Sequence, residues 1–459
     1  MVNNYNNIYF LGIGGIGMSA LAQYFKLSGH NVAGYDKIRS DNCIRLEKLG
    51  INIHYSDKSS NIPIDYKDVS TSLIVLTPAI PQDSEELFYF KSNEFKISKR
   101  SEILGLISND KAGIAVAGTH GKTSVSTITA WIMSNSPQSC SAFLGGISKN
   151  FDSNILINTE SDFTVVEADE FDRSFLQLKP STAIITSIEP DHLDIYNNFE
   201  TLQHAFCEFA AKIKKEGTLI LHKSIDKKQF ETIIPHVKIK TYGLNDSDCD
   251  YNLSNIIYKD GLCYFDINHP NGIIKDIKYS IGGNHNLENA LAATSAALSN
   301  QINENIIKDS LESFKGVIRR FDIQISKPNF VFIDDYAHHP SEISAFLNAI
   351  RTMYPNKKIT AVFQPHLYSR TKDFYKEFAK SLSVCENLIL LPIYPAREKP
   401  VEGINSELIL NLSLAPNKIL SQKKNLINEI KKICPEILVT MGAGDIDQFI
   451  KPIREEFSK

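Results

Sequence analysis

The sequence KAGIAVAGTHGKTSVS, residues 111–126, decides how the rest of the chain is organised. Residues 114–117 form a short apolar run typical of a buried strand, and residues 124–133 have the mixed apolar spacing of a helix. A glycine-rich turn, GTHGKT at residues 118–123, joins the two. In this order, backbone N–H groups at the helix start can hold a phosphate, the lysine can reach terminal phosphates and the last hydroxyl can bind Mg²⁺. We expect this loop to bind a nucleoside triphosphate.

The loop is shorter than the usual phosphate-loop pattern G-x-x-x-x-G-K-[ST], since Val116 stands where that pattern has a glycine. The plain alternative is a strand-to-helix turn that contains Gly-Lys-Thr without binding phosphate. Two later segments favour phosphate binding. An acidic cluster, EADEFDR at residues 167–173, follows a predicted strand at 163–166, where a phosphate-loop enzyme needs a metal carboxylate. A third predicted strand, residues 183–186, ends in a polar loop that contains His192.

The N-terminal region carries a second glycine motif, G-x-G-x-x-G at residues 12–17, between a predicted strand at 8–13 and a predicted helix at 18–27. A second strand, residues 31–35, ends at Asp36, where a dinucleotide-binding protein has an acid for the ribose. Alone, this pattern indicates a dinucleotide enzyme. However, such glycines guarantee only that the backbone can approach a diphosphate at a helix N-terminus, and a UDP-sugar meets that condition too.

Other predicted elements place polar segments at sheet edges. Residues 72–76 form a strand that leads into a loop beginning at Thr77, which we expect to face a ligand. Residues 207–280 have short strands and turn signals, and we expect them to extend the sheet of the central region. The sequence GGNHN then opens a predicted helix over residues 287–298, with Asn286 as its N-cap.

A third series of strands and helices follows in the C-terminal part of the chain. Polar segments follow its predicted strands, which cover residues 330–333, 359–363, 388–391 and 437–440. The sequence therefore predicts an α/β protein of three domains. These are a Rossmann-like N-terminal domain at 1–109, a central P-loop ATPase-like α/β domain at 110–316 and a C-terminal Rossmann-like α/β domain at 317–459.

The composition is that of a soluble globular protein, with 42% hydrophobic and 22% charged residues among 459 and a formal net charge of -4. The charges are interspersed and form no basic block, so we expect no nucleic-acid partner. The sequence suggests no membrane span, and its N-terminus lacks the pattern of a secretion signal. The seven cysteines are scattered and form no C-x-x-C pair, which is typical of reduced thiols in a cytoplasmic protein.

Seven motifs, taken together and in order, resemble those of the Mur ligases. They are GIGGIGMSALA (residues 12–22), GTHGKTS (118–124), EADEFDRSF (167–175), DHLDIY (191–196), NHNLENALAA (284–293), DDYAHHPSEI (334–343) and FQPHLYSRT (363–371). The resemblance covers about residues 8–445. It implies three domains that bind UDP-N-acetylmuramate, ATP and L-alanine respectively. It also implies ATP-dependent amide formation through an acyl phosphate, in peptidoglycan precursor synthesis. We expect a monomer or weak homodimer.

The resemblance also assigns site residues position by position. The catalytic residues would be Lys122, Glu167 and His192. Mg²⁺ would be held by Thr123, Glu167 and His192, and because histidine is an unusual ligand for Mg²⁺, we expect Mn²⁺ to be tolerated. ATP would contact Gly118, Thr119, His120, Gly121, Lys122, Thr123, Ser124, Asn284, Arg319 and Asp335. The UDP-sugar would contact Gly12, Gly14, Gly15, Ile16, Gly17, Asp36 and Thr77, and the amino acid would contact Tyr336, His338, His366 and Arg370.

Two positions depart from the usual motifs of the family. Ser124 stands where the phosphate loop usually has threonine, which is a conservative change. Leu367 stands where the motif FQPHRYTRT has an arginine. We therefore expect Arg370 to be the only guanidinium of this motif that can bind the carboxylate of the amino acid.

Three other functions compete with this interpretation. A related family member joins a recycled tripeptide to the same nucleotide sugar, but EADEFDRSF and DHLDIY look more like the alanine-adding enzyme. A dehydrogenase based on the N-terminal glycine motif would leave the second and third domains unused. A non-catalytic nucleotide-binding scaffold fits poorly with the presence of both Lys122 and Glu167.

Overall fold

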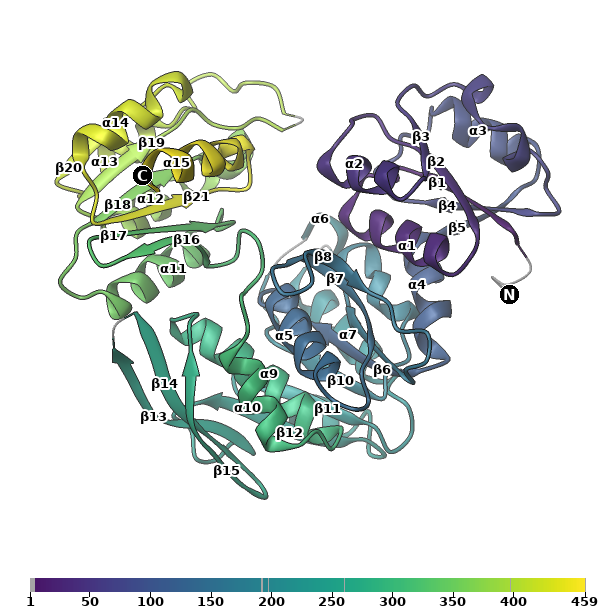
Figure 1. Ribbon diagram of the computed structural model, residues 1–459, viewed down its shortest axis with the longest axis horizontal. Coiled ribbons are helices and arrows are strands. Elements are labelled where there is room, and N and C mark those ends of the chain that lie inside the picture. Colours follow the sequence, from purple (N-terminus) through teal and green to yellow (C-terminus); the bar gives the residue numbers. More distant parts are fainter. Residues whose placement is uncertain (1–4, 191–192, 197, 260, 397, 459) are drawn as a thin grey trace. The chain divides into compact units, whose positions relative to one another are not determined.

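The computed structural model describes residues 5–190, 193–196, 198–259, 261–396 and 398–458 (Figure 1). The chain divides into two compact units. The first holds Met1–Ser254, Ile267–Ile274 and Glu288–Phe314, and the second holds Asn255–Asp266, Lys275–Leu287 and Lys315–Lys459. The predicted domain boundaries at residues 109 and 316 stay predictions, because the division into units does not follow them.

The N-terminal part of the first unit is a five-stranded parallel sheet in the order β3-β2-β1-β4-β5. Its strands are β1 (Asn7–Leu11), β2 (Asn31–Tyr35), β3 (Asn52–His54), β4 (Ser72–Leu76) and β5 (Lys96–Lys99), and its helices are α1 (Ile16–Leu27), α2 (Asp41–Lys48), α3 (Glu85–Ser92) and α4 (Arg100–Asn109). Alternate residues of β1 face opposite sides of the sheet, because Ile8 and Phe10 join one apolar cluster and Tyr9 and Leu11 join another. This strand order confirms the predicted Rossmann-like fold.

The central part of the chain is built around β6 in a ten-stranded sheet with the order β15-β14-β13-β12-β11-β10-β6-β9-β7-β8. Its strands are β6 (Ala112–Ala117), β7 (Ser141–Ser148), β8 (Ser153–Leu156), β9 (Phe163–Glu167), β10 (Thr182–Ile185), β11 (Thr218–His222), β12 (Lys238–Leu244), β13 (Tyr251–Lys259), β14 (Leu262–His269) and β15 (Gly272–Tyr279). Its helices are α5 (Lys122–Ser134), α6 (Leu193–Tyr196), α7 (Phe199–Ala210), α8 (Lys228–Glu231), α9 (Asn284–Ser299) and α10 (Glu304–Glu312). Strands β11 to β15 confirm the predicted extension of the sheet.

Helix α9 begins earlier than the sequence predicts. The prediction of Asn286 as the N-cap of a helix from residue 287 is wrong, because Asn286 lies inside the first turn. Its Nδ2 donates a hydrogen bond to the backbone oxygen of Gly282 at 2.9 Å. The side chain therefore satisfies a carbonyl before the helix and not an N–H at its start.

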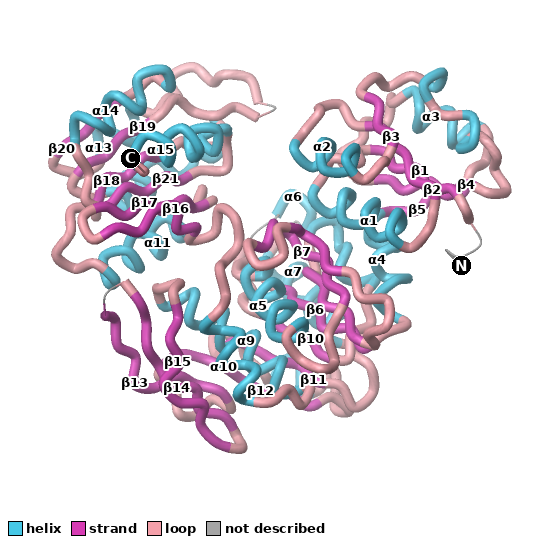
Figure 2. The backbone as a smooth tube through the Cα atoms, in the orientation of Figure 1, coloured by secondary structure: helices cyan, strands magenta, loops and turns pink. Residues whose placement is uncertain are grey.

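The C-terminal part of the second unit is a six-stranded sheet in the order β16-β17-β21-β18-β19-β20, in which only the β16–β17 pair is antiparallel. Its strands are β16 (Asp322–Lys327), β17 (Phe330–Asp335), β18 (Ile359–Phe363), β19 (Asn387–Leu390), β20 (Asn417–Leu420) and β21 (Ile437–Met441). Its helices are α11 (Pro340–Met353), α12 (Tyr368–Leu382), α13 (Glu407–Leu412), α14 (Leu426–Ile433) and α15 (Ile450–Phe457). Figure 2 shows strands and helices alternating along this part of the chain, as predicted.

None of the helices within the described ranges is both long enough and apolar enough to cross a bilayer. All seven cysteines are free thiols, and Cys43, Cys140, Cys263 and Cys385 are buried.

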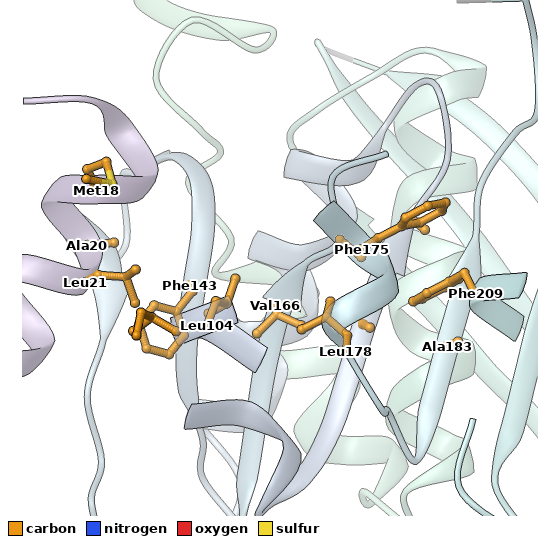
Figure 3. Packing of buried hydrophobic residues seen from close by; sticks show 14 of the residues in the cluster. Met18, Ala20, Leu21, Leu104, Phe143, Val166, Phe175, Leu178, Ala183 and Phe209 are labelled. Atoms are coloured by element: carbon orange, nitrogen blue, oxygen red, sulfur yellow. The ribbon is translucent and has the colours of Figure 1, made fainter. Parts of the chain in front are cut away.

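One apolar cluster runs through the N-terminal and central parts of the first unit (Figure 3). It includes Leu21 of α1, Leu104 of α4 and Phe143 of β7. At its other end, the rings of Phe175 and Phe209 stack with their centroids 5.0 Å apart. Burial of these large side chains is the main favourable contribution to the stability of this unit.

We predict that Phe209→Ala lowers the free energy of unfolding by about 3 to 5 kcal/mol, because it leaves a cavity in this cluster. Phe209 is fully buried, whereas Phe88 on α3 is 69% exposed. Phe88→Ala is therefore the matched control and should change stability by less than about 0.5 kcal/mol. Trp131 on α5 is the only tryptophan, so its fluorescence during urea unfolding measures the central part. Equal urea midpoints for the two variants would contradict this account of the core.

Candidate active site

The phosphate loop lies between the end of β6 and the start of α5, as predicted. Gly118 and Gly121 both have positive φ, at 130° and 82°. A Cβ atom at Gly118 would collide with the hydroxyl of Thr186, and one at Gly121 would lie 2.6 Å from Oδ1 of Asn289. The two glycines therefore let the loop adopt a left-handed backbone and approach the end of β10 and helix α9.

The segment after β10 fixes the shape of the loop. The backbone N–H of Thr119 donates to the Ser187 carbonyl at 3.1 Å, and the backbone N–H of His120 donates to Ser187 Oγ at 3.1 Å. The hydroxyl of Thr186 donates to the His120 carbonyl at 2.5 Å. The prediction of a polar loop after this strand is therefore confirmed for Ser187, while Thr186, predicted as the last residue of the strand, lies just beyond β10.

Lys122, the first residue of α5, turns its ammonium back over the loop. Its Nζ lies 2.6 Å from the carbonyl oxygen of Gly118 and 3.4 Å from that of Thr119. It also lies 2.8 Å from Oε1 of Glu170, which is fully buried. Sequence reasoning did not single out Glu170, although it belongs to the acidic cluster predicted to serve this loop.

Thr123 and Glu167, two of the predicted metal ligands, lie together. The Thr123 hydroxyl donates to Oε1 of Glu167 at 3.2 Å, and Oε2 of Glu167 accepts from the backbone N–H of Gly145 at 2.9 Å. A hydroxyl and a carboxylate are the oxygen ligands that Mg²⁺ prefers. The third predicted ligand, His192, lies outside the described residues. Within the described ranges, no group of three or more His, Cys, Asp or Glu side chains could hold a metal ion.

Ser124, a predicted ATP contact, and Asn289, a residue that was not predicted, lie near the start of α5. The role of Asn284, the other predicted contact, stays a prediction. Ser124 lies in the first turn of α5, and Asn284 is the first residue of α9. Asn289, further along α9, is the side chain that approaches Gly121. Asn289 lies within the motif NHNLENALAA, but only the fold shows which asparagine of that motif lies against the loop.

The N-terminal glycine motif packs against two of the residues predicted to bind the UDP-sugar. A Cβ at Gly12, where φ is 85°, would lie 2.5 Å from Cγ2 of Thr77. The backbone N–H of Gly14 donates to Oδ2 of Asp36 at 2.7 Å, while Oδ1 of Asp36 accepts from the N–H of Ile38 at 3.1 Å. The carboxylate that the motif predicts for a ribose is therefore bonded to the loop itself, and its contact with a ligand stays a prediction.

The remaining members of the motif lead into helix α1. Gly15 is the N-cap of α1, and Ile16 is its first residue. Arg100, which sequence reasoning did not assign, lies beside Gly17, because a Cβ there would be 2.8 Å from Nη1 of the guanidinium. Nη2 of Arg100 lies 3.9 Å from Oδ2 of Asp169. Sequence reasoning could have found Arg100 from its position, because it is a cation directly after β5, at the carboxyl end of a parallel strand, where ligands bind in such sheets.

In the second unit, Arg319 and Asp335 form part of a buried polar network around β17. The guanidinium of Arg319 lies 3.5 Å from Oδ2 of Asp334 and 3.3 Å from Oδ2 of Asp447. Asp335 accepts backbone N–H groups from Phe321 at 2.6 Å and from Ala337 at 2.8 Å. Burial raises the pKa of Asp334 to about 7 and that of Asp335 to about 6, although Arg319 and Arg320 respectively oppose the shift.

The four residues predicted to bind the amino acid lie after β17 and β18. The rings of Tyr336 and His338 are 5.2 Å apart, and those of His338 and His366 are 6.2 Å apart. Burial lowers the pKa of His338 to about 4, an effect that Arg370 strengthens and Glu342 opposes. Burial and Arg370 also lower the pKa of His366, so we expect both imidazoles to be neutral at pH 7.

Two side-chain nitrogens in this group have no hydrogen-bond partner within the described part of the chain. They are Nδ1 of His366 and Nη1 of Arg370, and both atoms are buried. Leu367, between them in sequence, has a φ of 70° and precedes helix α12. Its side chain offers no donor, so the two unpartnered nitrogens are the polar groups that an added carboxylate could satisfy.

The sheets and the loop around Lys122 are typical of α/β enzymes that use a nucleoside triphosphate. Three domain descriptions match the chain in order. They are the Mur ligase family, catalytic domain, at residues 7–112; the Mur ligase middle domain at 116–297; and the Mur ligase, glutamate ligase domain, at 319–444. The chain therefore belongs to the Mur ligase family, whose members use ATP.

Individual proteins are similar along the whole chain. The UDP-N-acetylmuramate–L-alanine ligase of Flavobacterium psychrophilum is 47% identical over 458 residues, which cover 100% of this chain and 99% of that protein. The enzyme of the same name from Cytophaga hutchinsonii is 44% identical and covers 98% of this chain and 96% of its own length. The crystal structure of UDP-N-acetylmuramate–alanine ligase from Thermotoga maritima matches with a TM-score of 0.82 at 26% identity, over 98% of this chain and 99% of that one.

We predict that Gly121→Ala weakens ATP binding at least tenfold, about 1.4 kcal/mol, because the new Cβ would push the loop away from Asn289. Gly29→Ala is the control, since Gly29 also has a positive φ, 90°, but a Cβ there meets nothing within 4 Å. Both variants carry the same kind of backbone strain, and only one has the collision. Calorimetric titration with ATP measures the difference, and equal dissociation constants for the two variants would contradict the assignment of the loop.

Proposed function

We propose that this protein joins L-alanine to the carboxylate of UDP-N-acetylmuramate, with ATP converted to ADP and phosphate. The product would be UDP-N-acetylmuramoyl-L-alanine, a peptidoglycan precursor made in the cytoplasm. The observation that carries the proposal is the identity of 42 to 47% to ligases of this name, over nearly the whole of both chains. The oligomeric state, monomer or weak homodimer, stays a prediction.

The chemistry requires activation of a carboxylate, which is a poor acylating agent. A carboxylate oxygen of the sugar attacks the γ-phosphorus of ATP, and ADP leaves. The amine of alanine then attacks the carbonyl carbon of the acyl phosphate, and phosphate leaves with the former carboxylate oxygen. Negative charge on phosphoryl oxygens must be neutralised in the first step, and Lys122, at the N-terminus of α5, would do this.

Thr123 and Glu167 would hold a divalent cation, and their oxygen atoms suit Mg²⁺. The cation would supply further neutralisation of phosphoryl charge when it is bound. The predicted third ligand, His192, would add a nitrogen, which is the basis for expecting Mn²⁺ to be tolerated.

The N-terminal part of the first unit would hold UDP-N-acetylmuramate. Residues 14–17 lead into α1, whose N-terminus favours the negative diphosphate. Arg100, beside Gly17, supplies the positive charge that the glycine motif lacks. A dinucleotide remains the alternative ligand, but the chain's match to the ligase family extends over all three domains.

The second unit would hold L-alanine. Nη1 of Arg370 and Nδ1 of His366 would bind its carboxylate, since both are buried and unpartnered among the described residues. The amine must lose a proton before it attacks the acyl phosphate. Burial keeps the ring of His338 neutral, and its lowered pKa makes that ring a weak base.

The direct test of the proposal is to incubate the protein with UDP-N-acetylmuramate, ATP and Mg²⁺ and to measure phosphate release with single amino acids. We expect release that depends on L-alanine. A murein peptide ligase from Psychrobacter arcticus shares the fold at 22% identity, with a TM-score of 0.67. The tripeptide L-alanyl-γ-D-glutamyl-meso-diaminopimelate is therefore the competing acceptor. Faster release with the tripeptide than with L-alanine would replace this proposal by the tripeptide activity.

We predict that Lys122→Ala lowers the rate of phosphate release by roughly 10²- to 10³-fold, about 3 to 4 kcal/mol, with little change in folding. The reason is that Lys122 would act on charge that develops on the phosphoryl group. Lys228→Ala on α8, an exposed lysine, is the control and should keep the wild-type rate. If Lys122→Ala stays within about threefold of wild type, the loop is not catalytic.

We predict that Arg370→Ala raises the KM for L-alanine well above tenfold, because loss of one partner of a buried charge pair costs on the order of 2 to 5 kcal/mol. Binding of ATP and of UDP-N-acetylmuramate should stay nearly unchanged. Lys372→Ala, an exposed cation on the same helix, is the matched control. An unchanged KM in Arg370→Ala would mean that other groups bind the carboxylate, with His338 and His366 the first to test.

A further inference from the structure

Glu170 is a buried carboxylate that the proposed chemistry does not use. Its side chain is 1% exposed, and Oε1 lies 2.8 Å from Nζ of Lys122. Its other oxygen, Oε2, has no hydrogen-bond partner among the described residues. The hydroxyl of Tyr196 donates to the backbone oxygen of Glu170 at 2.5 Å, which holds this segment in place. A buried charge with a single partner depends on that partner for its stability.

The ammonium of Lys122 has three N–H donors, and this structure offers three acceptors for them. These acceptors are the Gly118 carbonyl at 2.6 Å, Glu170 at 2.8 Å and the Thr119 carbonyl at 3.4 Å. A phosphoryl oxygen can therefore bind Lys122 only if one of the three is given up.

The three acceptors differ in what their loss would leave behind. If Lys122 gave up its bond to Glu170, the buried carboxylate would have neither oxygen bonded to a described residue. The contact with the Thr119 carbonyl is the longest of the three and close to the limit for a hydrogen bond. The Thr119 carbonyl is therefore the acceptor that is released most easily.

We propose that Glu170 is a positioning residue that stays bonded to Lys122 during turnover, while a phosphoryl oxygen replaces the Thr119 carbonyl. The carboxylate then fixes the direction of the ammonium, and the released N–H points to the phosphoryl group. This inference rests on the proposed ATP-dependent reaction, because it names a residue that acts through Lys122. Glu167 of the same acidic cluster, in contrast, lies against Thr123 and Gly145.

A double-mutant cycle tests this role, because a residue that acts only through Lys122 has nothing left to do once Lys122 is removed. The variants are Glu170→Ala, Lys122→Ala and the double variant, and kcat for phosphate release is measured with UDP-N-acetylmuramate, ATP and L-alanine. We expect Glu170→Ala to lose about 10²-fold in kcat, as for other groups that hold a charge-stabilising donor in place. The double variant should be no slower than Lys122→Ala.

Glu170→Gln provides a second arm, since glutamine keeps an oxygen for Lys122 and places no charge in the buried site. We expect it to recover at least tenfold of the activity that Glu170→Ala loses. Glu86→Gln is the matched control, because Glu86 on α3 is also fully buried but bonds to Tyr9, far from this loop in sequence. Its kcat should equal that of wild type.

Two results would overturn the positioning role. One is a Glu170→Ala kcat within threefold of wild type. The other is a double variant whose loss equals the product of the two single losses. If Trp131 fluorescence shows that Glu170→Ala unfolds at a lower urea concentration than wild type, the double-mutant cycle is repeated with Glu170→Gln and judged by the same two criteria. A wild-type chain that releases no phosphate with L-alanine refutes the proposed function instead, so the two failures are distinct.

Discussion

The contact between the ammonium of Lys122 and the buried carboxylate of Glu170 is the interaction on which the phosphate loop depends. It joins three segments, since Lys122 begins α5, the loop carbonyls follow β6 and Glu170 follows β9. Residues 118 and 121 are glycines with positive φ, which lets the same loop approach the end of β10 and helix α9. A single buried charge pair thus connects the local conformation of the loop to the packing of the sheet beneath it.

The strands and the motifs that follow them could be predicted from the sequence. Buried parallel strands are continuous apolar runs, so β6, β9 and β10 could be recognised in the sequence. Each of these strands is followed by polar residues at the same edge of the sheet. The start of α9 could not be placed, because asparagine is common both as an N-cap and in a first turn that bonds back to a preceding carbonyl. Local sequence does not distinguish these two uses.

The contacts that complete the sites could not be predicted, because they join segments that are distant in sequence. The cluster EADEFDR holds several carboxylates, and only the fold shows that Glu167 lies against Thr123 while Glu170 pairs with Lys122. Asp36 is engaged by the Gly14 N–H, a bond that the glycine motif does not indicate. In the second unit, the buried nitrogens of His366 and Arg370 that lack a partner among the described residues support the predicted amino-acid site more strongly than the motif that contains them.

If ATP activates the carboxylate as an acyl phosphate, one carboxylate oxygen must leave with the phosphate, and the fate of that atom can be measured. UDP-N-acetylmuramate with ¹⁸O in its carboxylate is converted with L-alanine and ATP, and the products are analysed by mass spectrometry. We expect one labelled oxygen of each carboxylate to appear in inorganic phosphate and the other to stay in the amide. Phosphate without the label would contradict this activation, because the carboxylate oxygen would then not have been bonded to phosphorus.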